Sequence, residues 1–208
     1  MRRFRHWTPR YILNRATEIL YQRMHPSDPW LTRDANMILR SLVRSQDVGL
    51  EFGSGRSTLW FAARVKHLTS VEHEEKWHTH VQARLKEGGF QNVTLHLCPS
   101  SAGAEHNAKY VGILDRLERN SLDFVSVDGI CRGACALAAL PKIRGGGFLL
   151  IDNVNWYLPC HSFSPNSRTL TQGPSDEVWA EVQDALSGWR RIWTTSGVTD
   201  TAFFFKGP

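Results

Sequence analysis

Residues 48–62 restrict the possible folds more than any other part of the chain. Apolar residues stand at every second position of residues 48–52, which predicts a short strand. A Gly-Ser-Gly turn follows at 53–55, and glycine permits both a positive φ angle and a close approach of a ligand to the backbone. Because the apolar run 59–62 then predicts a buried helix, the stretch is typical of the first unit of a nucleotide-binding α/β sheet.

Two acidic residues strengthen this prediction. The next predicted strand, residues 67–72, ends at Glu72, and an acid about 20 residues after such a glycine turn suits the two hydroxyls of a ribose. Glu51 lies inside the first strand, where a buried carboxylate is costly unless it is hydrogen-bonded, so we expect it to serve the site. Taken alone, the two glycines also fit a tight turn that binds no ligand.

Strands and helices alternate along most of the chain, which favours a doubly wound α/β fold with a mostly parallel sheet and helices on both faces. The last two predicted strands form a hairpin that adds one antiparallel strand to the sheet. Helices are expected at 110–119 and 133–143, and three glycines at 145–147 are expected to interrupt the chain before the fifth strand. The seven strands are predicted at residues 48–52, 67–72, 93–98, 122–128, 148–152, 191–195 and 201–206.

Small or polar residues end the first five of these strands. Ligands of open α/β sheets bind beyond the carboxyl ends of the strands. We therefore expect one site that is lined by Gly53, Glu72, Cys98, Asp128 and Asp152.

The first 47 residues precede the α/β pattern and are predicted to form an N-terminal helical cap on a core of residues 48–208. The apolar residues of a helix predicted at 9–24 share one face. Either this helix packs on the domain, or, being basic and amphipathic, it lies on an anionic membrane or covers a substrate. The residues of the apolar face are Ile12, Ala16, Ile19, Leu20 and Met24.

Composition excludes several classes of protein. The 208 residues include 25 Lys and Arg against 20 Asp and Glu, a net charge of +5, which is too small an excess to predict nucleic-acid binding. No apolar run is long enough to span a membrane, and none follows the basic start as in a signal peptide. The four cysteines have neither zinc spacing nor a disulfide pattern, so we expect a cytoplasmic protein.

As a set, these motifs resemble those of the class I S-adenosylmethionine-dependent methyltransferases. The segments that carry the resemblance are 51–55, 70–73, 122–128 and 146–154, and it extends from Val48 to the C-terminus. It implies a Rossmann-like sheet of seven strands and the transfer of a methyl group from S-adenosylmethionine. We expect O-methylation of a small-molecule, sugar or lipid-linked acceptor, with residues 1–30 covering the acceptor side of the site.

The resemblance also implies which residues hold the cofactor. Glu72 would bind the ribose hydroxyls, and Cys98 would lie near the adenine. The other residues expected at the cofactor are Glu51, Gly53, Ser54 and Gly55 along its methionine part, His73 beside the ribose, and Asp128.

Within this class, the chain resembles the small cation-dependent O-methyltransferases that act on catechols and caffeoyl esters. The resemblance implies magnesium ligands at Asp128, Asp152 and Asn153, and magnesium prefers such oxygen ligands. Cys131 stands where those enzymes have a lysine base, and the arginine that follows it stays protonated. Deprotonation of the acceptor would then fall to the metal or, in a metal-free relative, to Asp128, Asp152 or His161.

Two other functions fit the same pattern. A nicotinamide-dependent oxidoreductase shares the strand–turn–helix start, although Thr58 stands where its fingerprint has a third glycine. A non-catalytic binding module could also have this fold. Three residues near the predicted site have open roles: Arg56 binds an acidic group or lies on the surface, and Trp30 and Trp156 form a stacking wall or core.

Overall fold

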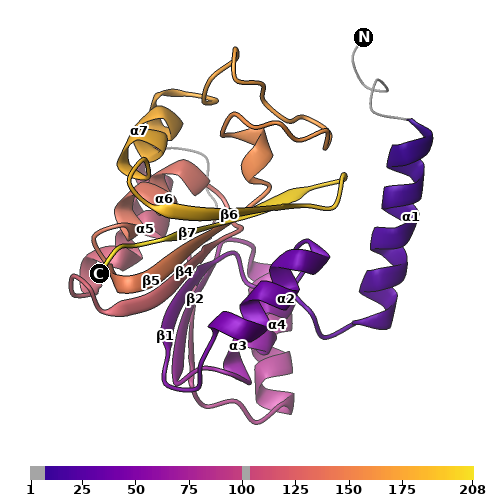
Figure 1. The fold of residues 1–208 in the computed structure, drawn as a ribbon. Coiled ribbons are helices and arrows are strands. Elements are labelled where there is room, and N and C mark those ends of the chain that lie inside the picture. The colour runs from indigo at the N-terminus through magenta and orange to yellow at the C-terminus, as the bar shows by residue number, and fades with distance from the viewer. Residues whose placement is uncertain (1–7, 100–103) are drawn as a thin grey trace.

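The computed structural model describes residues 8–99 and 104–208, which contain one seven-stranded sheet (Figure 1). Its strand order, β3-β2-β1-β4-β5-β7-β6, confirms the predicted doubly wound, Rossmann-like fold. The strands are parallel except β7, which pairs antiparallel with both β5 and β6. The strands are β1 (Val48–Phe52), β2 (His67–Glu72), β3 (Val93–Leu97), β4 (Leu122–Val127), β5 (Ile143–Asp152), β6 (Arg190–Thr195) and β7 (Asp200–Phe205).

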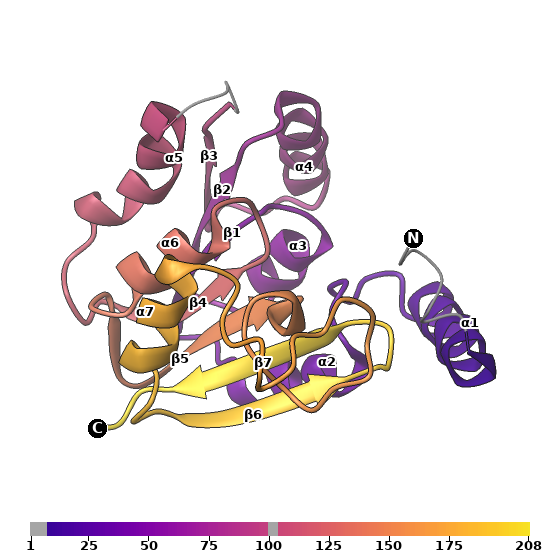
Figure 2. The ribbon, with the colours of Figure 1, turned by 90° about the horizontal axis from the view of Figure 1, so that it is seen from above.

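Helices cover both faces of the sheet (Figures 1 and 2). One face packs against α2 and α3, and the other packs against α5, α6 and α7. The helices are α1 (Pro9–Met24), α2 (Arg33–Leu42), α3 (Arg56–Ala62), α4 (Glu75–Glu87), α5 (Ala104–Val111), α6 (Arg132–Ala139) and α7 (Glu177–Ala185), with the 3-10 helices η1 (Gly112–Arg116) and η2 (Val154–Trp156).

Helix α2 belongs to this layered core although it lies within the predicted cap. The Thr32 hydroxyl accepts a hydrogen bond from the Ala35 backbone N–H at 3.2 Å, which caps the first turn. Ala35 and Leu39 are fully buried in the cluster that contains Trp60 and Phe61 of α3. The division at residue 47 stays a prediction, but the packing groups α2 with the sheet.

Helix α1 presents its apolar side to solvent. Its polar side faces the β6–β7 turn, where Glu18 is buried and Asn14 lies against Gly197. The helix stands apart from the layers that cover the sheet (Figure 1). The apolar face therefore does not pack on the domain, because its large side chains are widely exposed: Ile12 53%, Leu13 67%, Ile19 39%, Leu20 58% and Met24 66%.

Several element boundaries differ from those predicted, and the helix expected at 133–143 ends at Ala139, as α6. The helix expected at 110–119 begins earlier, as α5, and continues as η1. Strand β5 begins at Ile143 and runs through the three glycines that were expected to interrupt the chain. The pairing of β4 with β5 is irregular there, and a Cβ on Gly147 would lie 2.6 Å from the Asp123 carbonyl oxygen. Glycine thus permits the close strand approach instead of ending the strand.

Candidate functional site

A cavity of about 500 Å³ opens at the carboxyl ends of β1, β2 and β4. The strand order changes direction between β1 and β4, and open α/β sheets bind ligands at such a switch point. The cavity brings together the predicted residues Gly53, Ser54, Glu72, His73 and Asp128. It is also lined by residues that no motif singled out as part of the site, among them Trp77, Gly129 and Arg132.

Gly53 forms the floor of this cavity in a conformation that requires glycine. Its φ angle is +94°, and a Cβ there would lie 2.7 Å from the Gly129 backbone nitrogen. Its own N–H donates to the Val71 carbonyl at 2.9 Å, and the Asp128 N–H donates to the Phe52 carbonyl at 2.8 Å. These two hydrogen bonds join the carboxyl ends of β1, β2 and β4 to one another.

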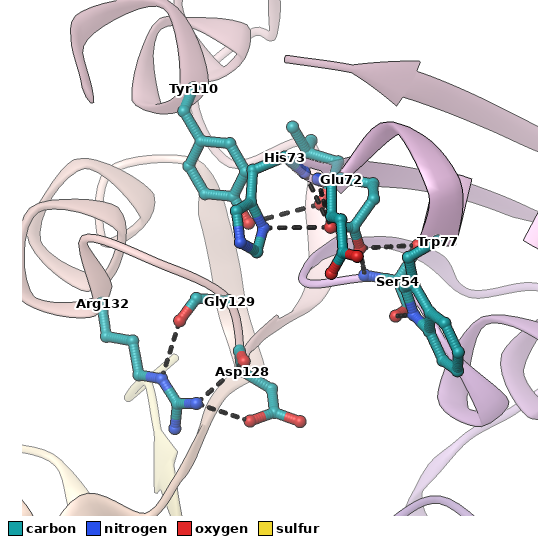
Figure 3. Close-up of polar contacts among 10 residues, drawn as sticks. Ser54, Glu72, His73, Trp77, Tyr110, Asp128, Gly129 and Arg132 are labelled. Carbon is teal, nitrogen blue, oxygen red and sulfur yellow. Dashed lines mark hydrogen bonds and ion pairs between the residues drawn. The ribbon is translucent and has the colours of Figure 1, made fainter. Parts of the chain in front are cut away.

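Glu72 lies at the end of β2, on one side of the cavity (Figure 3). Its buried carboxylate accepts hydrogen bonds from the backbone N–H groups of Ser54, His73 and Glu74 at 2.8–2.9 Å. The Ser54 hydroxyl also donates to it at 2.8 Å, and the His73 Nδ1 lies 3.0 Å from its Oε1 without hydrogen-bond geometry, a contact that is an ion pair only when the imidazole is protonated. Backbone donors therefore fix the carboxylate, while the two side-chain partners can rotate away for a ligand hydroxyl.

Glu51 is buried beneath the first turn of α3. Its Oε2 accepts hydrogen bonds from Thr58 at 2.6 Å and from Ser70 at 2.9 Å, while its Oε1 is buried without a partner. Burial raises the pKa of Glu51 to about 7, against the opposing effect of the nearby hydroxyls of Ser57, Thr58 and Ser70. Thr58 also accepts a hydrogen bond from the Gly55 N–H at 2.8 Å, so it connects the glycine turn to this carboxylate.

Two aromatic residues that the sequence analysis missed shape the cavity. The Trp77 ring N–H donates to the Ser54 carbonyl at 2.5 Å and holds the turn from α4. The fully buried Tyr110 hydroxyl donates to the Val71 carbonyl at 3.3 Å, and a Cβ on Gly129 would collide with it. Neither has a local sequence signal, because each reaches the site from a separate helix.

Asp128 and Arg132 form the opposite side of the cavity (Figure 3). The Arg132 Nη2 lies 2.9 Å from the Asp128 Oδ1, and in the described part of the chain the other carboxylate oxygen accepts no protein hydrogen bond. Burial raises the pKa of Asp128, and the guanidinium partly offsets this. Arg132 also reaches the end of β5, where its Nη1 donates to the Asp152 carbonyl at 2.6 Å and to the Asn153 Oδ1 at 3.0 Å.

The three predicted magnesium ligands do not fit a metal ion in this arrangement. The Asp152 carboxylate is buried and accepts a hydrogen bond from Thr201 at 2.6 Å. Burial, together with the nearby Asp128, raises the pKa of Asp152 to about 8, which favours a neutral acid. The guanidinium of Arg132 already lies between Asp128 and Asn153. Among the described side chains, those of residues 8–99 and 108–208, no three His, Cys, Asp or Glu residues gather as a metal site.

Three other predicted residues do not line this cavity. Gly55 lines a neighbouring cavity instead. The Cys98 N–H donates to the Glu72 carbonyl at 2.7 Å, so Cys98 lies close to Glu72, but it does not line the cavity. His161 is exposed in the loop after η2 and is not brought together with Asp128. Its role as a base stays a prediction.

A second cavity, of about 880 Å³, lies between α3 and α4 and shares Trp30 and Trp77 with the first. Its wall includes Arg56, whose guanidinium carbon lies 4.8 Å from the centroid of the Trp30 ring. The Arg56 Nη1 is buried and has no hydrogen-bond partner. A cation fixed on an aromatic face with an unused donor suits an acidic group of a ligand. Trp156 lines neither cavity.

Comparison with protein families gives one match: a family model described as a methyltransferase domain matches residues 50–154. The matched segment begins inside β1 and ends after β5, so it contains the glycine turn, Glu72, Asp128 and Arg132. A comparison with curated proteins found no match.

Solved structures with the same fold include several methyltransferases. A methyltransferase-like protein from Silicibacter pomeroyi is 24% identical with a TM-score of 0.56, over 88% of this chain and 91% of that one. A protein from Staphylococcus aureus, provisionally named caffeoyl-CoA O-methyltransferase, is 17% identical with a TM-score of 0.56, over 98% and 95% of the two chains. At these identities the structures support the fold.

Proposed function

The chain belongs to the methyltransferase domain family, and we propose that it transfers a methyl group from S-adenosylmethionine to an oxygen of a small-molecule, sugar or lipid-linked acceptor. The observation that carries this proposal is the cavity at the ends of β1, β2 and β4, where the Gly53 turn and the fixed Glu72 carboxylate lie together. Family membership also favours methyl transfer over a nicotinamide-dependent oxidoreductase or a binding module that lacks chemistry.

The residues of this cavity fit the cofactor part by part. Ribose hydroxyls would donate to Glu72 in place of the Ser54 side chain, with His73 beside them. The methionine part would follow the turn at Gly53 and Gly55, where glycine lets the backbone approach closely. The ammonium group of the methionine part would lie near Glu51, whose buried Oε1 has no hydrogen-bond partner, and its positive charge would compensate the charge of that carboxylate. Cys98 would lie on the adenine side. When bound, the cofactor supplies a methyl group on a positively charged sulfur.

Asp128 is the residue that we propose as the catalytic base. It lines the cavity, its second carboxylate oxygen accepts no hydrogen bond from the described residues, and desolvation raises its pKa above the ordinary value of a carboxyl group, which makes it a stronger base. Asp128 would accept the proton of the acceptor hydroxyl, and the bound cofactor would supply the methyl group to that oxygen, leaving as the demethylated thioether. Asp152 is a poorer candidate because it is buried beside Thr201. Because Arg132 lies among the predicted magnesium ligands, none of these steps uses a metal ion.

The acceptor would enter past Trp30, where the two cavities meet. The ring of Trp30 can stack on a planar or sugar acceptor, and the unused donor of Arg56 can bind an acidic group on it. Because Pro26 and Ser27 also line the second cavity, the segment before α2 covers this side. We therefore favour an acceptor that carries a carboxylate or phosphate as well as a hydroxyl.

We further propose that α1 holds the protein on an anionic membrane surface. Its exposed apolar side is flanked by Arg10, Arg15 and Arg23, and the exposed ring of Phe163 lies 6.0 Å from the Arg10 guanidinium. Exposed apolar side chains edged by arginines are typical of helices that lie in a lipid interface. A second copy of the same basic surface would repel this one. None of the helices within the described residues has the length and hydropathy of a membrane span.

Co-sedimentation with vesicles tests the membrane proposal. The protein should bind phosphatidylserine vesicles at low salt and lose binding when Leu13 and Leu20 are changed to serine. Ile192→Ser, an exposed apolar residue on β6, is the matched control and should leave binding intact. Equal binding by both variants, or a change of oligomeric state in place of vesicle binding, would contradict a lipid contact through α1.

The enzymatic proposal is tested with labelled S-adenosylmethionine and a panel of acceptors. The panel should pair hydroxylated compounds with the corresponding amines, each with and without an acidic group. We expect label to pass to hydroxylated acidic members. Transfer to the amines alone would refute oxygen as the acceptor atom. Failure of the cofactor to bind would refute the proposal as a whole.

A further inference from the structure

Arg132 uses every N–H group of its guanidinium on oxygen atoms at the ends of β4 and β5. Its Nε donates to the Gly129 carbonyl at 2.9 Å, and its Nη2 donates to the Asp128 carbonyl at 2.9 Å and contacts the Asp128 carboxylate at 2.9 Å. Its Nη1 donates to the Asp152 carbonyl and the Asn153 amide oxygen. An arginine has five such donors, so none is left for a ligand.

These five partners form a cage made only of oxygen. It comprises three backbone carbonyls, one carboxylate and one side-chain amide. Oxygen sets of this kind are the ligands that Mg²⁺ and Ca²⁺ prefer in proteins. The cage therefore selects for a cation, and in this chain the cation is a side chain that stays charged at any working pH.

Local backbone geometry directs the side chain into the cage. Cys131 precedes α6 with a φ angle of +49°, a left-handed conformation that turns the chain just before Arg132. Only 12% of the Arg132 side chain is exposed, against 36% of the Asp128 side chain. On the other side, the Asn153 amide N–H donates to Thr199 at 2.5 Å, which orients its oxygen toward the guanidinium.

We infer that Arg132 takes the place of the divalent cation, so that this methyltransferase holds its acceptor side together without a bound metal. Arg132 is a positioning residue: it aligns Asp128 and Asn153 but has no free donor for the acceptor. Asp128 keeps one carboxylate oxygen for the substrate. The inference rests on the proposed function only where it concerns methyl transfer, because the cation cage itself is independent of the acceptor.

Binding of Mn²⁺, followed by electron paramagnetic resonance, tests this inference without any acceptor. The wild-type protein should bind no Mn²⁺ at this site. Arg132→Ala should open the cage and gain an Mn²⁺ site, at least about tenfold tighter than any residual binding of Mn²⁺ by the wild type elsewhere on its surface, and adding Asp128→Asn should remove that site. Arg132→Lys keeps a cation in place and should bind none. Arg144→Ala breaks another arginine–aspartate pair, with Asp123, and should gain no site.

Several results would overturn the inference. Wild-type binding of Mn²⁺ that is lost in Asp128→Asn would show that the metal and Arg132 coexist. No gain in Arg132→Ala, with its folding confirmed by thermal unfolding, would show that the cage does not select for cations. If Arg132→Ala does not fold, two measurements on the wild type still test the inference: the Mn²⁺ titration and methyl transfer in excess chelator. Transfer that stops in chelator and returns with Mg²⁺ would contradict the inference while leaving the methyltransferase proposal intact.

Discussion

The two sides of the cavity hold their carboxylates in different ways. Glu72, at the end of β2, accepts hydrogen bonds from three backbone N–H groups and a hydroxyl, none of which carries a charge. Asp128, at the end of β4, is held by the guanidinium of Arg132. Neutral donors fix a carboxylate and leave its charge available to ligand hydroxyls, whereas a guanidinium compensates the charge and orients the group.

This difference indicates that the two sides of the cavity suit different chemical roles. The Glu72 side is suited to binding, since a fixed anion accepts hydrogen bonds from a ribose without moving. The Asp128 side is suited to proton transfer, since its second oxygen is open to the cavity while the first is held. The predictions below test each side separately.

The largest effect is expected on the Asp128 side. Asp128→Asn removes the proposed base and should lower turnover by roughly 10²–10⁴-fold, the usual contribution of general base catalysis, with cofactor binding largely kept. Steady-state kinetics together with calorimetric titration of the demethylated cofactor would measure both quantities. Asp184→Asn, an exposed acid on α7, is the control. Unchanged turnover would transfer the role to another group such as His161.

The next effect concerns Glu51 and pH. Its pKa in the folded protein is about 7 against 4.5 ordinarily, so its contribution to stability is fully present below about pH 4.5 and is lost as the pH rises through 7. The loss is on the order of 3 kcal/mol. An ammonium group beside the Glu51 Oε1 would offset it. The rise in Tm caused by the demethylated cofactor should therefore be larger at pH 8 than at pH 6.

Glu51→Gln is the matched control for that experiment. Glutamine keeps the shape of the side chain and does not ionise. In this variant, the rise in Tm caused by the demethylated cofactor should therefore change little between pH 5 and pH 8. Thermal unfolding of both proteins with and without cofactor measures this. The same pH profile in the variant would show that another group is responsible.

A smaller effect is expected at Arg56. Arg56→Gln removes one charge-assisted hydrogen bond and the contact with Trp30, and should raise KM for an acidic acceptor about tenfold. Turnover at saturation and KM for the cofactor should change little. Arg33→Gln, on the exposed side of α2, controls for the loss of net charge. Equal KM values for acidic and neutral acceptors in both proteins would argue against an acid-binding role.

The place of Gly53 and Glu72 in the cavity could be predicted from sequence because the signals are local. The alternating strand, the glycine turn and the acid that ends the next strand identify Gly53 and Glu72 directly, and parallel strands then bring them together. The helices behind the cavity gave no such signal. Trp77 and Tyr110 reach the site through tertiary packing, which leaves no trace in residue spacing.

Arg132 is the clearest example of a site residue whose contacts could not be predicted from the sequence. Its guanidinium stays protonated, which excludes it as a base from sequence alone. Its place among the oxygens of β4 and β5, however, depends on the left-handed turn at Cys131 and on the pairing of two strands. Helix α1 is a similar case. Periodicity predicts its apolar face, but not that its polar side contacts the β6–β7 turn while the apolar side remains exposed.

The central claim is that S-adenosylmethionine binds at the Gly53 turn with its ribose on Glu72. Calorimetric titration of S-adenosylmethionine into the wild-type protein, Glu72→Ala and the control Glu75→Ala tests it most directly. We predict saturable binding to wild type and to Glu75→Ala. In Glu72→Ala the cofactor should bind more weakly, with a loss in binding free energy of about 1.5–3 kcal/mol for each lost charge-assisted hydrogen bond. Equal affinity of all three proteins for the cofactor would contradict this account of the site.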